Sequence, residues 1–240
     1  HIHVMKHIHE ANFLQVVEGE IDSSHVGFLH SRLDEPQNAK QQTDWYLRYR
    51  AQDFAPRFSV ADTNYGVLIG ARRNAEQDGY YWRVTQWLAP FFTMIPRNPG
   101  TPLNMRAWVP IDDGNTWSFQ VSCRIDRPNT PEERAGFRRS FDELVPGTYR
   151  MTANKDNDYL IDRQVQKTET YCGIPSYPVR IGRAQDGAMT ESMGPVVDRT
   201  REHLGTSDTA IIAVRRWMLR AVRRLQQGEA PFAAANPWVY

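Results

Sequence analysis

The stretch Tyr65-Gly-Val-Leu-Ile-Gly-Ala-Arg-Arg-Asn-Ala-Glu-Gln-Asp-Gly-Tyr-Tyr-Trp-Arg-Val-Thr-Gln-Trp87 consists of two runs of apolar, β-branched and aromatic residues. The turn-forming residues Glu76-Gln-Asp-Gly79 separate the two runs. This pattern is typical of two strands joined by a tight turn. Because parallel strands need a much longer crossover, so short a connection favours antiparallel pairing. The stretch therefore predicts a hairpin within an antiparallel sheet.

The same pattern continues on both sides of this hairpin. Asp112-Asp-Gly-Asn115 marks a second short turn, and the first ten residues alternate partly as a strand does. Together with the hairpin strands 65–73 and 79–87, the expected strands are residues 58–61, 105–109 and 116–123.

Three segments have the pattern of helices: residues 12–32, 130–144 and 208–227. The second begins with Thr130 and Pro131, which are preferred at a helix N-cap and first helical position. The third carries an apolar stripe from Ile211 to Leu225. Strands, a central helix and a long C-terminal helix predict an α+β domain. A curved antiparallel sheet that grips a long helix would enclose a cavity suited to an apolar ligand.

Two long segments are expected to lack regular structure. Ser31–Trp45 is polar and is predicted to be a mobile loop or lid. Residues 146–195 are rich in Gly, Pro, Asp and Asn and are too long for a plain connector. Irregular segments of this length in a domain are often functional.

The composition excludes several classes of protein. Of the 240 residues, 40% are hydrophobic and 24% charged, and the net charge is +1, without the basic excess of a nucleic-acid-binding protein. The sequence has no transmembrane-length apolar run and no signal peptide. Cys123 and Cys172 lie far apart, which favours reduced thiols in a cytoplasmic protein. The start at His1, without a methionine, predicts that the sequence comes from the middle of a longer protein.

The run Glu18-Gly-Glu-Ile-Asp-Ser-Ser-His-Val-Gly-Phe-Leu-His30 places two histidines and several carboxylates in an apolar segment. Two histidines and one carboxylate hold Fe(II) with open positions in oxygen-activating enzymes. Residues five apart on a helix differ by about 140° in direction, so His25 and His30 share a metal only if the helix bulges or ends between them. Asp22 is either a ligand or the carboxylate that orients a histidine.

The third ligand has to come from elsewhere in the chain. The best distant candidate is Asp208, at the start of the predicted C-terminal helix. Taken by itself, an aspartate at this position is more often a helix-capping or first-turn acid than a metal ligand. A pair of histidines held by ordinary hydrogen bonds also remains an open interpretation of His25 and His30.

Two long runs resemble a known family. Residues 12–30 and the run Gln185-Asp-Gly-Ala-Met-Thr-Glu-Ser-Met-Gly-Pro-Val-Val-Asp-Arg-Thr-Arg-Glu-His-Leu-Gly-Thr-Ser-Asp208 resemble Rieske-type aromatic-ring oxygenases, most closely the phthalate 4,5-dioxygenase branch. The resemblance implies a helix-grip catalytic domain in which His25, His30 and Asp208 ligate one mononuclear Fe(II). It also implies that Asp22 is the family's bridging aspartate and Asn12 a polar residue near the iron. Members of this branch are homotrimers.

One departure from the family is large. The family carries an N-terminal domain whose [2Fe–2S] Rieske cluster is held by two Cys and two His. Neither cysteine of this chain has that spacing. Residues 1–240 are therefore expected to be the mononuclear-iron catalytic part of a longer oxygenase. The cluster would belong to a missing domain, with electrons arriving from NAD(P)H through a reductase or ferredoxin.

The expected activity is O₂-dependent hydroxylation or cis-dihydroxylation of an aromatic, carboxylated substrate in aromatic-compound catabolism. Candidate residues for holding the substrate are Ser23, Arg48, Arg50 and Arg106, since Arg offers two donors to a carboxylate. Each arginine also fits a structural or surface role. The alternatives are an oxidative O-demethylase, a non-catalytic module that binds apolar ligands and, more weakly, a zinc hydrolase.

Overall fold

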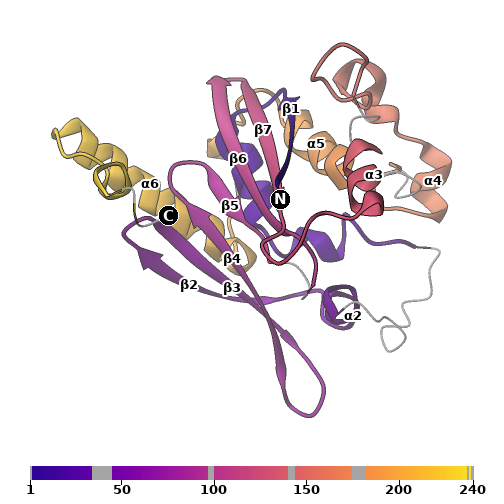
Figure 1. Cartoon of the computed structure of the whole chain (residues 1–240), viewed down its shortest axis with the longest axis horizontal. Helices are drawn as coiled ribbons and strands as arrows, with labels where there is room; N and C mark the ends of the chain where they lie inside the picture. Colours follow the sequence, from indigo (N-terminus) through magenta and orange to yellow (C-terminus); the bar gives the residue numbers. More distant parts are fainter. Residues whose placement is uncertain are drawn as a thin grey trace.

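The structure is a computed structural model, and it describes residues 2–33, 45–96, 100–139, 144–174, 182–236 and 238. Seven antiparallel strands form one sheet in the order β1-β7-β6-β5-β4-β3-β2 (Figure 1). The strands are β1 (Ile2–His9), β2 (Arg57–Thr63), β3 (Gly66–Asn74), β4 (Tyr80–Leu88), β5 (Phe92–Met94), β6 (Leu103–Asp112) and β7 (Asn115–Cys123).

The β3–β4 hairpin has the predicted form. Val67 pairs with Trp87 and Ile69 with Thr85, so one face of the hairpin carries buried side chains. In the turn, Gln77 and Asp78 adopt positive φ angles, which short polar residues tolerate better than β-branched ones. The turn residues therefore set the register, and the register sends the apolar side chains to the core.

The helices and 3₁₀ turns connect and cover this sheet. They are α1 (Phe13–Ile21), η1 (His25–Gly27), α2 (Trp45–Gln52), α3 (Pro131–Arg139), η3 (Lys155–Leu160), α4 (Arg163–Thr168), α5 (Gly182–Ser192), η4 (Arg199–Arg201), η5 (Thr206–Asp208), α6 (Thr209–Gln226) and α7 (Phe232–Ala235). In Figure 1, α1, α5 and α6 lie behind the sheet.

The main core lies between the sheet and these helices. Val17 of α1 and Val214 of α6 are fully buried against Ile69 and Trp87 of the sheet. The α6 helix is also fixed by a hydrogen bond, since Trp217 Nε1 donates to the carbonyl oxygen of Thr63 (2.9 Å). The predicted α+β class, with a sheet packed on a long C-terminal helix, is confirmed.

Three predictions about local structure need correction or lie outside the described residues. The helix expected over residues 12–32 ends at Ile21. The segment 146–195, expected to be irregular, contains α4 and all of α5. The predicted lid, Ser31–Trp45, falls mostly on residues that the structure does not describe.

Two further features bear on the predicted class. Both cysteines are free thiols. Among the described residues, no helix combines the length and the apolar character that crossing a bilayer requires.

Candidate metal centre

The chain leaves the helical path at Asp22, and this exit positions the first histidine. The Asp22 carboxylate accepts hydrogen bonds from the backbone N–H groups of Ser24 (2.7 Å) and His25 (3.0 Å). An aspartate that binds the N–H groups following it competes with the helical hydrogen bonds and ends the helix. His25 therefore begins a separate 3₁₀ turn, and its ring is free of the α1 face.

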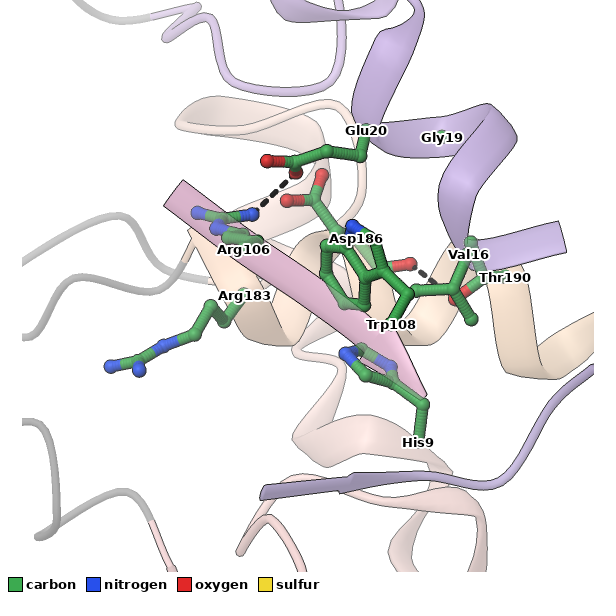
Figure 2. A pocket seen from close by; sticks show the side chains of 9 residues that line it. All are labelled: His9, Val16, Gly19, Glu20, Arg106, Trp108, Arg183, Asp186 and Thr190. Carbon is green, nitrogen blue, oxygen red and sulfur yellow. Dashed lines mark hydrogen bonds and ion pairs between the residues drawn. The ribbon is translucent and has the colours of Figure 1, made fainter. Parts of the chain in front are cut away.

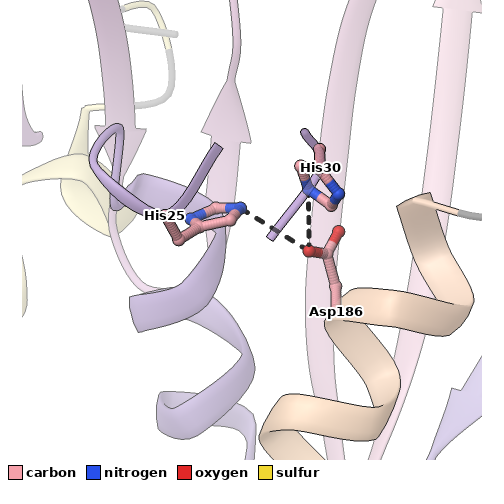
Figure 3. A group of neighbouring side chains, drawn as sticks. All are labelled: His25, His30 and Asp186. Atoms are coloured by element: carbon pink, nitrogen blue, oxygen red, sulfur yellow. Dashed lines mark ion pairs between the residues drawn. The ribbon is translucent and has the colours of Figure 1, made fainter. Parts of the chain in front are cut away.

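His25 and His30 face a carboxylate from the other end of the chain. Their ring centroids lie 5.1 Å apart. Oδ1 of Asp186, on α5, lies 3.5 Å from His25 Nε2 and 3.1 Å from His30 Nε2 (Figure 3). One donor atom from each of the three residues lies within 4.8 Å of the others. Among the described residues, the His, Cys, Asp and Glu side chains that are spaced to hold a metal ion are these three.

Each imidazole is held through its other nitrogen. Asp22 Oδ2 lies 3.4 Å from His25 Nδ1, and Gln185 Oε1 lies 2.7 Å from His30 Nδ1. Because Gln185 donates its Nε2 to the carbonyl oxygen of Ile174 (3.0 Å), its Oε1 is the acceptor and His30 Nδ1 is the donor. The proton on Nδ1 leaves the Nε2 lone pair of His30 available to a metal.

The charges around the centre are strongly coupled. Burial by itself would lower the pKa of His25, but hydrogen bonds and charge from Asp186 and Asp22 outweigh it and raise the pKa to about 10. Burial would raise the pKa of Asp186, yet its contacts with the two histidines hold that pKa well below the ordinary value. His25 also holds the pKa of Asp22 below its ordinary value, against the effect of burial. The carboxylates therefore favour a cation at this point.

The residues fit a divalent metal ion. Two imidazole nitrogens and one carboxylate oxygen converge, and nitrogen and oxygen donors of this kind suit Fe(II) and also Zn(II). The side chains of His25, His30 and Asp186 are 23%, 20% and 33% exposed, so the donor atoms remain reachable by small molecules. Three protein ligands leave further coordination positions for exogenous ligands.

A small, partly open cavity adjoins this centre. Residues of α1, β1, β6 and α5 line it, among them Glu20, Arg106, Trp108 and Asp186 (Figure 2). Arg106 forms an ion pair with Glu20 inside the cavity. Burial raises the pKa of the Glu20 carboxyl above its ordinary value, and Arg106 opposes that shift.

Comparison with known proteins defines the family. The family model described as "LigXa C-terminal domain like" matches residues 1–239. The chain belongs to this family. The oxygenase subunit of 3-chlorobenzoate-3,4-dioxygenase from Comamonas testosteroni is 35% identical over 233 residues, which cover 89% of this chain and 51% of the relative. The oxygenase subunit of phthalate 4,5-dioxygenase from Pseudomonas putida is 35% identical over 240 residues, which cover 95% of this chain and 52% of the relative.

The LigXa C-terminal-like domain thus spans about half the length of these curated relatives. Among solved structures, dicamba monooxygenase bound to dicamba matches 95% of this chain and 60% of its own, with a TM-score of 0.53 and 12% identity. The Pseudomonas putida CBB5 NdmA QL mutant with theobromine matches 95% and 52%, with a TM-score of 0.52 and 14% identity. At these identities the two structures show a shared fold and nothing further. The resemblance to the phthalate 4,5-dioxygenase branch is confirmed by sequence identity.

Two expected members of the metal site lie elsewhere in this LigXa C-terminal-like domain. Asp208 begins α6, where its Oδ2 accepts a hydrogen bond from the N–H of Gly205 (2.8 Å), and it is not part of the histidine group. Asn12 is the N-cap of α1, at the end of the helix remote from the histidines, and its Oδ1 accepts from the N–H of Leu14 (3.0 Å). Asp186 is the carboxylate that lies beside the two histidines.

Asp186 was missed because its segment was expected to be irregular. A helical signal was available, since Ala184 and Ala188 are small, apolar and four residues apart, and both are buried. Gln185 and Asp186 also open the second run that resembles the family. The run contains the aspartate that lies beside the histidines, Asp186, at its beginning and the expected one, Asp208, at its end.

The four candidate substrate residues separate into two groups. Ser23 is buried next to Asp22, and its Oγ accepts a hydrogen bond from Arg83 Nη1 (3.1 Å). Arg106 lines the cavity but is paired with Glu20.

The other two candidates lie on α2. Arg48 pairs with Glu76 of the β3–β4 turn, and the guanidinium of Arg50 lies 5.5 Å from the ring centre of Tyr46. Neither residue lines the cavity.

Proposed function

We propose that this chain is the catalytic domain of an oxygenase that holds one Fe(II) between His25, His30 and Asp186 and hydroxylates or cis-dihydroxylates an aromatic acid. The observation that carries the proposal is the convergence of two Nε2 atoms and one carboxylate oxygen beside a cavity. Bound there, Fe(II) supplies the O₂-dependent oxidation, and the protein binds the substrate and limits access of water. The names of the two relatives, which are oxygenases of chlorobenzoate and phthalate, support this class of substrate.

The protein residues have defined tasks in this proposal. Asp22 and Gln185 hold the rings of His25 and His30 in the tautomer and orientation that present Nε2. Such supporting residues affect metal affinity almost as strongly as the ligands themselves. Asp186 supplies the third donor and the negative charge, in place of Asp208.

The source of electrons is part of the proposal. The Asp22 side chain is 22% exposed while it contacts His25, so a neighbouring molecule can reach it. We assign it the bridging role, between this centre and the Rieske [2Fe–2S] domain of another subunit in a homotrimer. Electrons would come from NAD(P)H through a reductase or ferredoxin.

We assign the substrate carboxylate to Ser23, Arg83 and Arg73, which are buried and lie outside the lining of the cavity. Arg83 donates to Ser23 Oγ, and Arg73 Nη2 donates to the carbonyl oxygen of Ser23 (2.7 Å). Arg73 Nη1 is buried and has no hydrogen-bond partner among the described residues. Burial, together with the charge of Arg83, lowers the pKa of Arg73. A carboxylate would satisfy this donor and offset the repulsion between the two guanidinium groups.

The direct test is metal analysis followed by turnover. Purification under anaerobic, reducing conditions should yield about one iron per chain, and His25→Ala or His30→Ala should remove it. Oxygen uptake by the full-length protein with its reductase should then depend on an aromatic acid. Zinc at full occupancy, or iron content unchanged in both variants, would contradict the proposal.

Product analysis separates the two oxidative outcomes that this centre supports. A diol or phenol that retains every ring substituent indicates ring hydroxylation. Release of formaldehyde from a methoxylated aromatic acid indicates oxidative O-demethylation. Tight binding without oxygen uptake would favour the non-catalytic ligand-binding module.

A further inference from the structure

One carboxylate oxygen in the cavity has no partner. The Glu20 side chain is only 7% exposed, and its Oε2 is paired with Arg106. Its Oε1 is buried and accepts no hydrogen bond within the part of the chain that the structure describes. Glu20 lines the cavity together with Asp186 and Trp108 (Figure 2).

An unpartnered, buried carboxylate oxygen is costly. Leaving a buried acceptor unsatisfied destabilises the folded state, and more so when the group is charged. The charged groups that act on Glu20 are Arg106, Arg83, His25 and Asp186. The first is already engaged by Oε2, and neither Arg83 nor His25 makes a hydrogen bond to Oε1. The described residues therefore leave this oxygen able to accept a donor from the content of the cavity.

We propose that Glu20 Oε1 accepts a hydrogen bond from a hydroxyl or amino group on the aromatic ring of the substrate. This inference rests on the proposed function and narrows its substrate class to aromatic acids that carry a hydrogen-bond donor. The donor's O–H or N–H bond stays intact, so the interaction binds and orients the ring without a chemical step.

The distribution of charge separates the two ends of such a substrate. Glu20 and Asp186 make one wall of the cavity acidic, and a substrate carboxylate placed there would be repelled. The place proposed above for the carboxylate is beside Ser23, Arg73 and Arg83, none of which lines this cavity. Glu20 is thus a specificity residue that selects the polar ring substituent and places it on the side of the metal centre.

Calorimetric titration of the whole chain, reconstituted with Fe(II) and kept free of O₂, tests this assignment. The probes are benzoate and the 2-, 3- and 4-isomers of hydroxybenzoate, aminobenzoate and methoxybenzoate. A hydrogen bond to a charged acceptor contributes about 1.5–3 kcal/mol, so at least one hydroxy or amino isomer should bind about 10-fold or more tightly than its methoxy counterpart.

The variant Glu20→Gln should reduce that preference to about threefold or less, because a neutral amide is a weaker acceptor. The matched control is Glu191→Gln. Glu191 is also buried (7% exposed) and contacts His9 of the cavity wall, but it does not line the cavity, so the preference should persist. Circular dichroism and melting curves establish that each variant is folded.

Three results would overturn the inference. One is a wild-type protein that binds methoxy and hydroxy isomers equally at all three ring positions, as expected if a water molecule alone satisfies Oε1. Another is a preference that survives in Glu20→Gln. The third is loss of the preference in Glu191→Gln as well.

If Glu20→Gln does not fold, the comparison of hydroxy, amino and methoxy ligands on the wild-type protein still tests the inference. The two proposals also fail separately. A chain that binds no iron would sink the oxygenase assignment, while the ligand preference, measured on the same chain without metal, would remain testable.

Discussion

The beginnings of α5 and α6 each carry an aspartate, and the two have different partners. Asp208 at the start of α6 accepts a hydrogen bond from Gly205, three residues earlier in its own turn. Asp186 in the first half of α5 meets His25 and His30, which follow a helix at the other end of the chain. A capping contact is local and any helix start can use it. A metal ligand depends on how separate elements pack.

The largest effect should be the difference in iron content between variants in which one or the other of these two aspartates is replaced. Asp186→Ala is expected to reduce iron content from about one per chain to nearly none, because a three-residue donor set loses its only carboxylate. Asp208→Ala should retain the iron. Metal analysis of both variants, purified side by side under anaerobic conditions, measures the difference. Iron lost from Asp208→Ala and kept in Asp186→Ala would reverse the assignment.

Replacing Gln185, the neighbour of Asp186, should have a smaller effect on metal binding at the same centre. Gln185→Ala removes the acceptor that holds His30 Nδ1 and should weaken metal affinity by about 10- to 100-fold. Competition with a chelator measures the affinity. The control is Ser122→Ala, which loses the hydrogen bond that Ser122 Oγ of β7 donates to Asn104 Oδ1 (2.8 Å) but no contact with the centre. Equal affinities in the two variants would show that Gln185 does not support the centre.

The pH dependence of stability should distinguish the two aspartates in protein stripped of metal. His25 has its pKa raised from 6.5 to about 10 by folding. Its ion pair therefore stabilises the folded state fully below pH 6.5, and this contribution declines as the pH rises towards 10. The decline is at most about 1.4 kcal/mol per pH unit for one group.

Urea unfolding between pH 6.5 and 10 measures this decline, and His25→Ala should flatten it. Asp208→Ala should keep the parent's dependence on pH. The contribution of Asp186 to stability depends on pH in the opposite direction. Its pKa is lowered by folding, so its contribution is present above about pH 4 and is lost as the pH falls further. A parent protein whose stability rises from pH 6.5 to 10 would contradict the pairing of His25 with the two carboxylates.

The smallest effect is expected at α6. Asp208→Ala removes the hydrogen bond to Gly205 and should lower the free energy of unfolding by about 1 kcal/mol. Chemical denaturation measures it, and Asp208→Asn, which keeps an acceptor oxygen, should recover most of the loss. A much larger loss would mean that this aspartate does more than close its own turn.

Much of the sheet was predictable because hairpin strands are defined by local signals. The expected strands 65–73 and 79–87 correspond to β3 and β4 within one or two residues, since Gln77, Asp78 and Gly79 confine the turn. The short strand β5 was not predicted, because three residues are too few for a visible alternation. The α6 helix agrees with the predicted segment 208–227 within one residue at each end.

The metal site was predictable only in part. His25, His30 and the orienting Asp22 are close in sequence, and the spacing required the helix to be interrupted. The interruption occurs before His25, where the Asp22 carboxylate binds its own following backbone, so the helix predicted over residues 12–32 was too long. The supporting contacts of Arg73 and Arg83 were not predicted, because both arginines lie in strand patterns that show only which residues alternate.

The sequence by itself determined the antiparallel sheet, the long C-terminal helix and the family, because turn chemistry, periodicity and extended motifs are properties of short segments. Only the tertiary structure shows which aspartate lies beside the histidine pair. Packing of α5 against α1 brings Asp186 to within 3.1 Å of His30, whereas Asp208 is held in its own turn. The same packing buried Glu20 in the cavity with one oxygen unpaired. The distance between two side chains in the folded chain cannot be read from their separation in sequence. That distance distinguishes a candidate metal ligand from a residue that only closes its own turn.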